Sequence, residues 1–119
     1  MIDLKRLHNK MKLEVFNLSK KFNEITAVNN LSFSIEKNKT LGLLGPNGCG
    51  KTTAIGMMLG LITPSNGKVF IDDEPFNNSN KINLLSQMNF ASPYIELPKK
   101  LTVIQNLEIY ARLYGVINF

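Results

Sequence analysis

One stretch decides the fold: Gly45-Pro46-Asn47-Gly48-Cys49-Gly50-Lys51-Thr52-Thr53. Its outer glycines, its lysine and its first threonine follow the phosphate-loop spacing G-x-x-x-x-G-K-[ST]. Glycines at positions 45, 48 and 50 let the backbone curl until successive N–H groups point inward, because no Cβ restricts φ or keeps an anion away. The stretch therefore predicts a binding site for a nucleoside triphosphate.

The polar side chains of this stretch have separate expected tasks. Lys51 would reach the β- and γ-phosphates as a point charge, and the Thr52 hydroxyl would ligate Mg²⁺, which prefers oxygen donors. Thr53 would hold the phosphate nearer the base. A helix starting near Lys51 would add unpaired N–H groups and the positive end of its dipole. The expected nucleotide-binding residues of the loop are thus Gly45, Pro46, Asn47, Gly48, Cys49, Gly50, Lys51, Thr52 and Thr53, with Thr52 as the metal ligand.

The flanks of the stretch fit a phosphate loop. Residues 40–44 form a short apolar run ended by Gly-Pro, which is typical of a strand buried in a parallel sheet. Residues 51–61 are mostly apolar and contain no proline, which favours a packed helix. The alternative is an ordinary glycine turn between a strand and a helix. A dinucleotide motif G-x-G-x-x-G fits poorly, because Thr53 stands at the third glycine position.

Hydrophobic periodicity predicts the remaining elements. Alternation or short apolar runs indicate strands over residues 12–18, 28–35, 68–71 and 88–91. Apolar residues recur at helical spacing from Thr102 to Tyr114. Thr102 and Gln105 are spaced as a capping box at the start of this helix, and Gly115 is placed to end it.

Composition bounds the class of protein. The chain has 119 residues, 44% of them hydrophobic and 19% charged, which is ordinary for a globular domain but short for a complete phosphate-loop ATPase. Its net charge is +5, but the lysines are scattered without interleaved aromatics, so we expect no nucleic-acid partner. No signal peptide or membrane span is visible, and a single cysteine cannot form an internal disulfide. We therefore expect a cytoplasmic protein.

Around the loop, the chain resembles the N-terminal part of an ABC transporter ATP-binding subunit, from Met11 to Phe119. Gly45-Pro46-Asn47-Gly48 leading into Gly50-Lys51-Thr52-Thr53 is more particular to ABC proteins than the phosphate-loop pattern alone. The rest of the likeness lies in residues 18–22 with 27–33, in residues 60–69, and in residues 101–103 ahead of 106–107. The resemblance implies an α/β fold of the phosphate-loop NTPase type, truncated, with a β-rich N-terminal flank beside the phosphate-loop strand and helix.

The resemblance also implies a base site. In the family an aromatic near the first turn stacks on adenine, and Phe22 stands at the matching place. Stacking suits any flat base and contributes about 1 kcal/mol. Val28 would line the same site, and for both residues a purely structural place in the core is the alternative.

One departure from the family concerns catalysis. The family places a glutamine at the loop that joins its two subdomains, where Pro93 stands here with Ser92 beside it. Neither side chain can take the place of glutamine toward Mg²⁺ and water. The signature loop, the second acidic strand and the later histidine of the family are also missing from these residues. We therefore name no catalytic residue, and we expect this chain alone to bind ATP without turnover.

These observations combine into a functional expectation. Residues 1–11 would be an N-terminal extension, and residues 12–119 the N-terminal portion of an ABC ATP-binding domain. The cofactors implied are ATP and Mg²⁺, and the partners implied are a second ATP-binding subunit and a transmembrane permease, at the inner face of the membrane. The parent would power solute transport, in the export direction. The alternatives are a soluble non-transport ABC ATPase, a nucleotide-binding regulatory fragment without turnover, and a product that does not fold stably.

Overall fold

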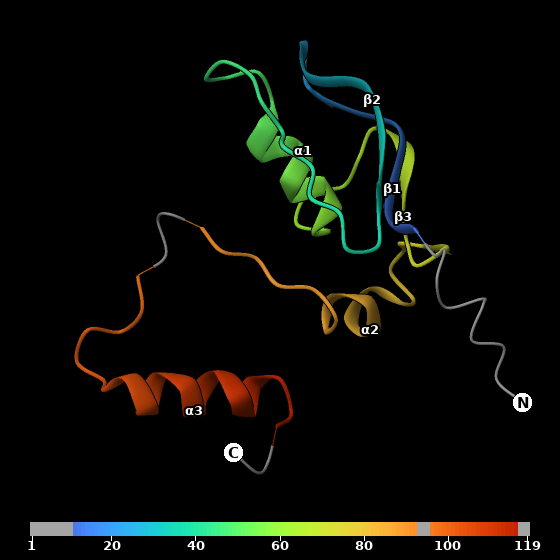
Figure 1. Cartoon of the computed structure of the whole chain (residues 1–119). Helices are drawn as coiled ribbons and strands as arrows, with labels where there is room; N and C mark the ends of the chain where they lie inside the picture. Colours follow the sequence, from blue (N-terminus) through green and yellow to red (C-terminus); the bar gives the residue numbers. More distant parts are fainter. Residues whose placement is uncertain (1–10, 93–95, 117–119) are drawn as a thin grey trace, which may run out of the picture. The chain divides into compact units, whose positions relative to one another are not determined.

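The computed structural model describes residues 11–92 and 96–116 and divides into two compact units between Leu84 and Leu85. The first unit contains a four-stranded antiparallel sheet in the order β2-β1-β3-β4, with the helix α1 beside it (Figure 1). Its elements are β1 (Met11–Phe22), β2 (Ile25–Glu36), α1 (Lys51–Met58), β3 (Asn66–Ile71) and β4 (Glu74–Pro75). The short helix α2 (Lys81–Leu85) follows at the division, and the second unit contains α3 (Val103–Leu113).

The sheet forms where alternation predicted it. β1 pairs with β2 through a tight hairpin in which Phe22 lies opposite Ile25, and with β3 on its other side. Side chains of alternate residues point to one face of a sheet, so Val15, Val69 and Ile71 share the inner face. The strands predicted over 12–18, 28–35 and 68–71 are confirmed, each longer than its sequence pattern indicated.

The core of the first unit lies between this inner face and α1. Its most buried side chains are Leu18, Met57, Ile71 and Val15, each less than 2% exposed. Ala54 of α1 is 2% exposed. Because α1 directly follows the glycine-rich stretch, the core fixes that stretch against the sheet.

Two predicted strands are wrong. Residues 40–44 form no strand, and Leu44 is 92% exposed rather than buried. A strand needs a neighbour for its N–H and C=O groups, and every strand pairing in the described part of the chain is antiparallel and lies among β1, β2, β3 and β4. Residues 88–91 are also irregular. A short apolar run indicates a strand only where a partner strand is present.

The predicted helix from Thr102 is confirmed. The Thr102 hydroxyl accepts a hydrogen bond from the Gln105 N–H at 3.2 Å, and the Gln105 side chain accepts one from the Thr102 N–H at 2.9 Å. This is the predicted capping box. Gly115 follows α3 with a φ of +76°, as expected for the end of a helix.

The apolar side chains of α3 are not core residues of the described chain. Val103, Ile104, Leu107 and Leu113 are each more than 60% exposed. Among the described residues, no helix is long and apolar enough to cross a membrane. The expected N-terminal extension spans residues 1–11, of which residues 1–10 lie outside the described residues.

Candidate nucleotide-binding site

The glycine-rich stretch ends in the N-terminus of α1, as predicted. Gly50 is the N-cap residue in the left-handed conformation, with φ 91° and ψ 6°, and Gly48 has φ 82°. Gly50 has no side chain that could cap this helix start, and no acidic residue lies in the first turn. The N-cap residue therefore leaves the first-turn N–H groups of α1 without a side-chain cap, which is the arrangement that suits an anion.

The Lys51 side chain folds back over the loop that precedes it. Its ammonium donates to the carbonyl oxygens of Gly45 at 2.6 Å and Pro46 at 2.8 Å. Its Nζ also lies 3.7 Å from the Cys49 sulfur. An ammonium has three protons, so two strong bonds hold it over the loop while the third is directed to a weak acceptor. A phosphate oxygen could replace the sulfur without breaking the bonds to the carbonyls.

Gly50 is in close contact with β2. A Cβ at Gly50 would come within 2.1 Å of the Ala27 carbonyl oxygen and 3.1 Å of Val28 Cγ2. Only glycine permits this approach, which brings the loop against the strand. Val28 is 8% exposed, so it is a core residue that also lies beside the loop. The core reading of Val28 is therefore confirmed, and its place beside a nucleotide base stays a prediction.

Phe22 lies at the end of the β1–β2 hairpin and is 46% exposed, so it is not a core residue. The ammonium of Lys20 lies over its ring, 4.9 Å from the centroid. A half-exposed aromatic at a strand end is available for stacking on a flat ligand.

The remaining loop side chains are accessible. Cys49 and Thr52 are exposed and Thr53 is half-buried. A Cβ at Gly45 would come within 2.6 Å of the Cys49 sulfur, so this sulfur lies directly over the backbone of Gly45. Pro93, which stands where the family has glutamine, lies outside the described residues.

Three acidic residues, Asp72, Asp73 and Glu74, follow β3. Asp72 and Asp73 have φ of 48° and 66° and form the tight turn between β3 and β4. This positive-φ pair is typical of a two-residue hairpin, for which aspartate is suited. Among the described residues, no group of three or more His, Cys, Asp or Glu side chains is placed to hold a metal ion.

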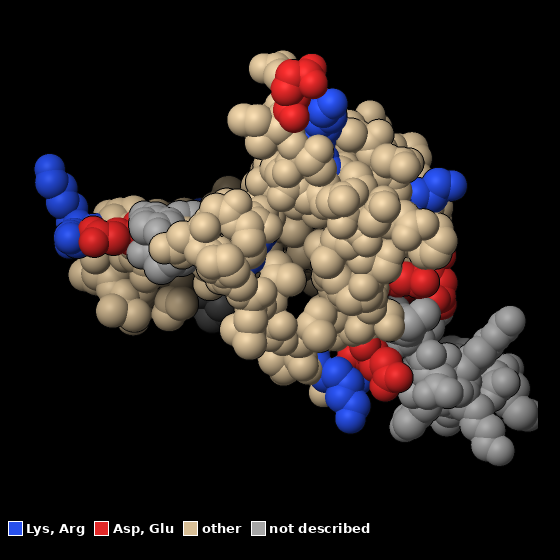
Figure 2. All heavy atoms as spheres, turned by 90° about the horizontal axis from the view of Figure 1, so that it is seen from above, with Lys and Arg blue, Asp and Glu red and all other residues tan. Residues whose placement is uncertain are grey.

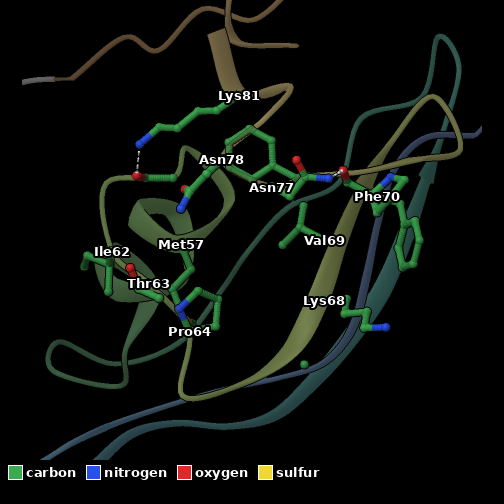
Figure 3. A pocket seen from close by; sticks show the side chains of 14 residues that line it. Met57, Ile62, Thr63, Pro64, Lys68, Val69, Phe70, Asn77, Asn78 and Lys81 are labelled. Carbon is green, nitrogen blue, oxygen red and sulfur yellow. Dashed lines mark hydrogen bonds between the residues drawn. The ribbon is translucent and has the colours of Figure 1, made fainter. Parts of the chain in front are cut away.

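A separate pocket of about 540 Å³ lies between the end of α1 and β3. In Figure 3, Lys81 extends from α2 to the carbonyl of Gly60. A Cβ at Gly60 would come within 2.7 Å of the Phe76 ring, and its φ is +65°. This contact was not predicted from the sequence. A glycine near the end of a predicted helix indicates a left-handed helix end, and Gly60 was such a glycine.

The basic residues show no concentration on the face seen in Figure 2. There the blue side chains stand apart from one another, and several lie beside acidic ones. Ion pairs in the described part of the chain include Lys21 with Glu24 at 3.5 Å and Lys99 with Glu96 at 2.6 Å.

Comparison with known proteins identifies the family. Residues 28–118 match the model of the ABC transporter family. The chain is 34% identical over 106 residues to Nod factor export ATP-binding protein I of Bradyrhizobium diazoefficiens, covering 89% of the chain and 34% of that protein. It is 40% identical over 106 residues to bacitracin transport ATP-binding protein BcrA of Enterococcus faecalis, covering 87% of the chain and 33% of that protein.

Solved structures agree with this match. A structure described as the ATP binding subunit of an ABC transporter superposes with a TM-score of 0.76 and 26% identity, over 87% of this chain and 43% of that one. A nucleotide-free ATP-binding cassette from an ABC transporter matches with a TM-score of 0.54 and 30% identity, over 59% of this chain and 27% of that one.

The chain belongs to the ABC transporter family. The resemblance predicted from the sequence is therefore confirmed, together with the truncated phosphate-loop fold. The chain spans about a third of the length of the curated relatives quoted above. Among the described residues no strand pairs with residues 40–44, and Leu44 is exposed.

Proposed function

We propose that this chain binds Mg-ATP through the loop 45–53, as the N-terminal portion (residues 12–119) of an ABC ATP-binding domain. The observation that carries the proposal is the α1 N-terminus, which has no side-chain cap and lies beside the ammonium of Lys51. Backbone N–H groups and one cation then converge on the same loop. This combination is what a phosphate chain requires.

The residues present fit the proposed ligand. At Gly48 a Cβ would meet nothing within 4 Å, so the backbone of the loop is uncovered at this glycine. Lys51 would donate its third proton to a phosphate oxygen, and the exposed Thr52 hydroxyl would be a ligand of Mg²⁺. Bound Mg²⁺ would neutralise part of the phosphate charge. Phe22 would stack on the adenine ring, with Val28 beside it.

We further propose that the parent protein powers solute transport, in the export direction. Two relatives that cover most of this chain are named for Nod factor export and bacitracin transport, which supports the proposal. A zinc import protein of Rickettsia bellii is 48% identical, but it covers only 50% of the chain. The partners would be a second ATP-binding subunit and a transmembrane permease, which would hold the subunit at the inner face of the membrane.

Calorimetric titration of the purified chain with Mg-ATP tests the binding proposal. Saturable binding with one ligand per chain is the expected result. Circular dichroism on the same sample establishes that the chain is folded. A folded chain that takes up no Mg-ATP at millimolar concentration would refute the proposal.

Replacing the Thr52 hydroxyl tests the metal role. Thr52→Val keeps the shape of the side chain but removes its oxygen, so we expect Mg-ATP affinity to fall while affinity for ATP in excess EDTA stays unchanged. The decrease should be roughly 5- to 10-fold, the effect of one net hydrogen bond or ligand contact. Thr52→Ser, which keeps the oxygen, is the matched control. Equal losses with and without Mg²⁺ would place the hydroxyl elsewhere.

Alkylation of Cys49 tests the position of the loop. The Cys49 sulfur lies over Gly45, so N-ethylmaleimide attached there would fill the space that a phosphate needs. We expect alkylation to abolish Mg-ATP binding and saturating Mg-ATP to slow the labelling, as followed by mass spectrometry. Cys49→Ala should resist the reagent and still bind. Labelling at the same rate with and without nucleotide would contradict this prediction.

A further inference from the structure

Lys20 makes two contacts that the proposed site does not explain. Its ammonium lies over the Phe22 ring, 4.9 Å from the centroid, and it donates a hydrogen bond to the Thr63 carbonyl oxygen at 2.8 Å. The two contacts join the end of the β1–β2 hairpin to the segment that follows α1. We propose that Lys20 is a positioning residue, which holds the Phe22 ring in place for stacking on the nucleotide base. This inference rests on the proposed ATP site.

The hairpin end has further connections to the same segment. The Lys21 N–H donates to the Ser65 hydroxyl at 3.0 Å, and the Ser65 N–H donates to the Ser19 carbonyl at 2.9 Å. These bonds fix the backbone around Lys20 on both sides. The Thr63 carbonyl is therefore a fixed point from which the ammonium can hold the ring.

The pairing of β1 with β2 also links Lys20 to the phosphate loop through a chain of neighbouring residues. In the β1–β2 pairing it is opposite Val28, and Val28 Cγ2 lies 3.1 Å from the position that a Cβ on Gly50 would take. Lys20 and Phe22 are two residues apart on β1, and the ammonium of Lys20 lies 4.9 Å from the Phe22 ring centroid, so the two side chains are on the same side. One strand pair thus connects the N-cap of α1 to the proposed base site.

The physical reason for a positioning role is the exposure of Phe22. A ring that is 46% exposed at a strand end can sample several rotamers, and a ligand that stacks on it must select one. An ammonium over one face restrains the ring and leaves the opposite face for a flat base. Lys20 would then strengthen base binding without touching the nucleotide.

The experiment compares two ligands on the 119-residue chain. Mg-ATP reports the base and the phosphates together, and inorganic tripolyphosphate with Mg²⁺ reports the phosphates alone. We expect Lys20→Met to weaken Mg-ATP roughly two- to five-fold and to leave tripolyphosphate unchanged. Lys20→Arg keeps the cation and should restore Mg-ATP affinity. Lys21→Met is the matched control, since it removes the same charge from the neighbouring residue, whose ammonium pairs with Glu24.

A double-mutant cycle with Phe22→Leu separates action through the ring from other effects. In the Phe22→Leu chain, Lys20→Met should change Mg-ATP affinity no further. A loss that persists without the ring, or an equal loss for tripolyphosphate, would overturn the inference while leaving the ATP site intact. A wild-type chain that binds neither ligand would instead remove the proposed function itself, and a wild-type chain that binds both equally would remove the base site.

Discussion

Lys51→Ala should lose Mg-ATP affinity by about 10- to 100-fold, because a hydrogen bond to a charged group contributes about 1.5–3 kcal/mol. The Lys51 ammonium is held over the loop by its bonds to the carbonyls of Gly45 and Pro46. Alanine removes both the charge and these two bonds. The loop would then lose its closed form as well as its contact with phosphate. Calorimetry gives the affinity directly.

The control for this variant removes the same charge elsewhere. Lys37→Ala lies in the exposed turn after β2 and should bind Mg-ATP like the wild type. The hydrogen bonds of Lys51 are exposed, so its removal should leave the thermal unfolding midpoint nearly unchanged. A folded Lys51→Ala chain with wild-type affinity would exclude the loop as the phosphate site.

Gly67→Ala should lower the free energy of unfolding by about 2–5 kcal/mol, from left-handed strain plus overpacking. Gly67 has a φ of +88°, and its Cβ would come within 2.4 Å of the Asn17 carbonyl oxygen and 2.6 Å of Leu18 Cα. Both atoms belong to the backbone of β1. Leu18 is fully buried, so β1 cannot move aside without disturbing the core. Urea denaturation followed by circular dichroism measures the loss.

Gly48→Ala is the matched control for this substitution. Its φ of +82° is nearly that of Gly67, but a Cβ there would meet nothing within 4 Å. It should therefore show only the left-handed strain, about 1–2 kcal/mol. If the two variants lose equal stability, β1 accommodates the methyl group and the close approach at Gly67 is not a constraint.

The sequence predicted correctly those features that depend on residues close together in the chain. The capping box of Thr102 and Gln105 needs only side chains three residues apart, and it forms as expected. The positive φ of Gly48 and Gly50 agrees with the curled loop expected from glycines at these positions. Alternation located β1, β2 and β3, although not their ends, because pairing extends a strand beyond its apolar pattern.

Long-range pairing could not be predicted from a local pattern. Residues 40–44 have the composition of a buried parallel strand, yet Leu44 is 92% exposed. Whether such a run becomes a strand depends on neighbours distant in the sequence. The same limit applies to the apolar residues of α3, whose spacing predicts a helix but not what covers its exposed face.

The sequence by itself determined the family, the phosphate loop and the helix that follows it, because motif spacing, glycine conformation and helix capping act over a few residues. Only the tertiary structure decided how that loop is held. It placed Gly50 against Ala27, folded Lys51 onto two loop carbonyls and put the Lys20 ammonium over Phe22. The contact of Gly50 with Ala27 joins segments distant in the chain, and close packing of the sheet against α1 brings them together. The contacts of Lys51 with the loop carbonyls and of Lys20 with Phe22 are between residues close in the chain, and the backbone of the folded loop and hairpin sets their geometry.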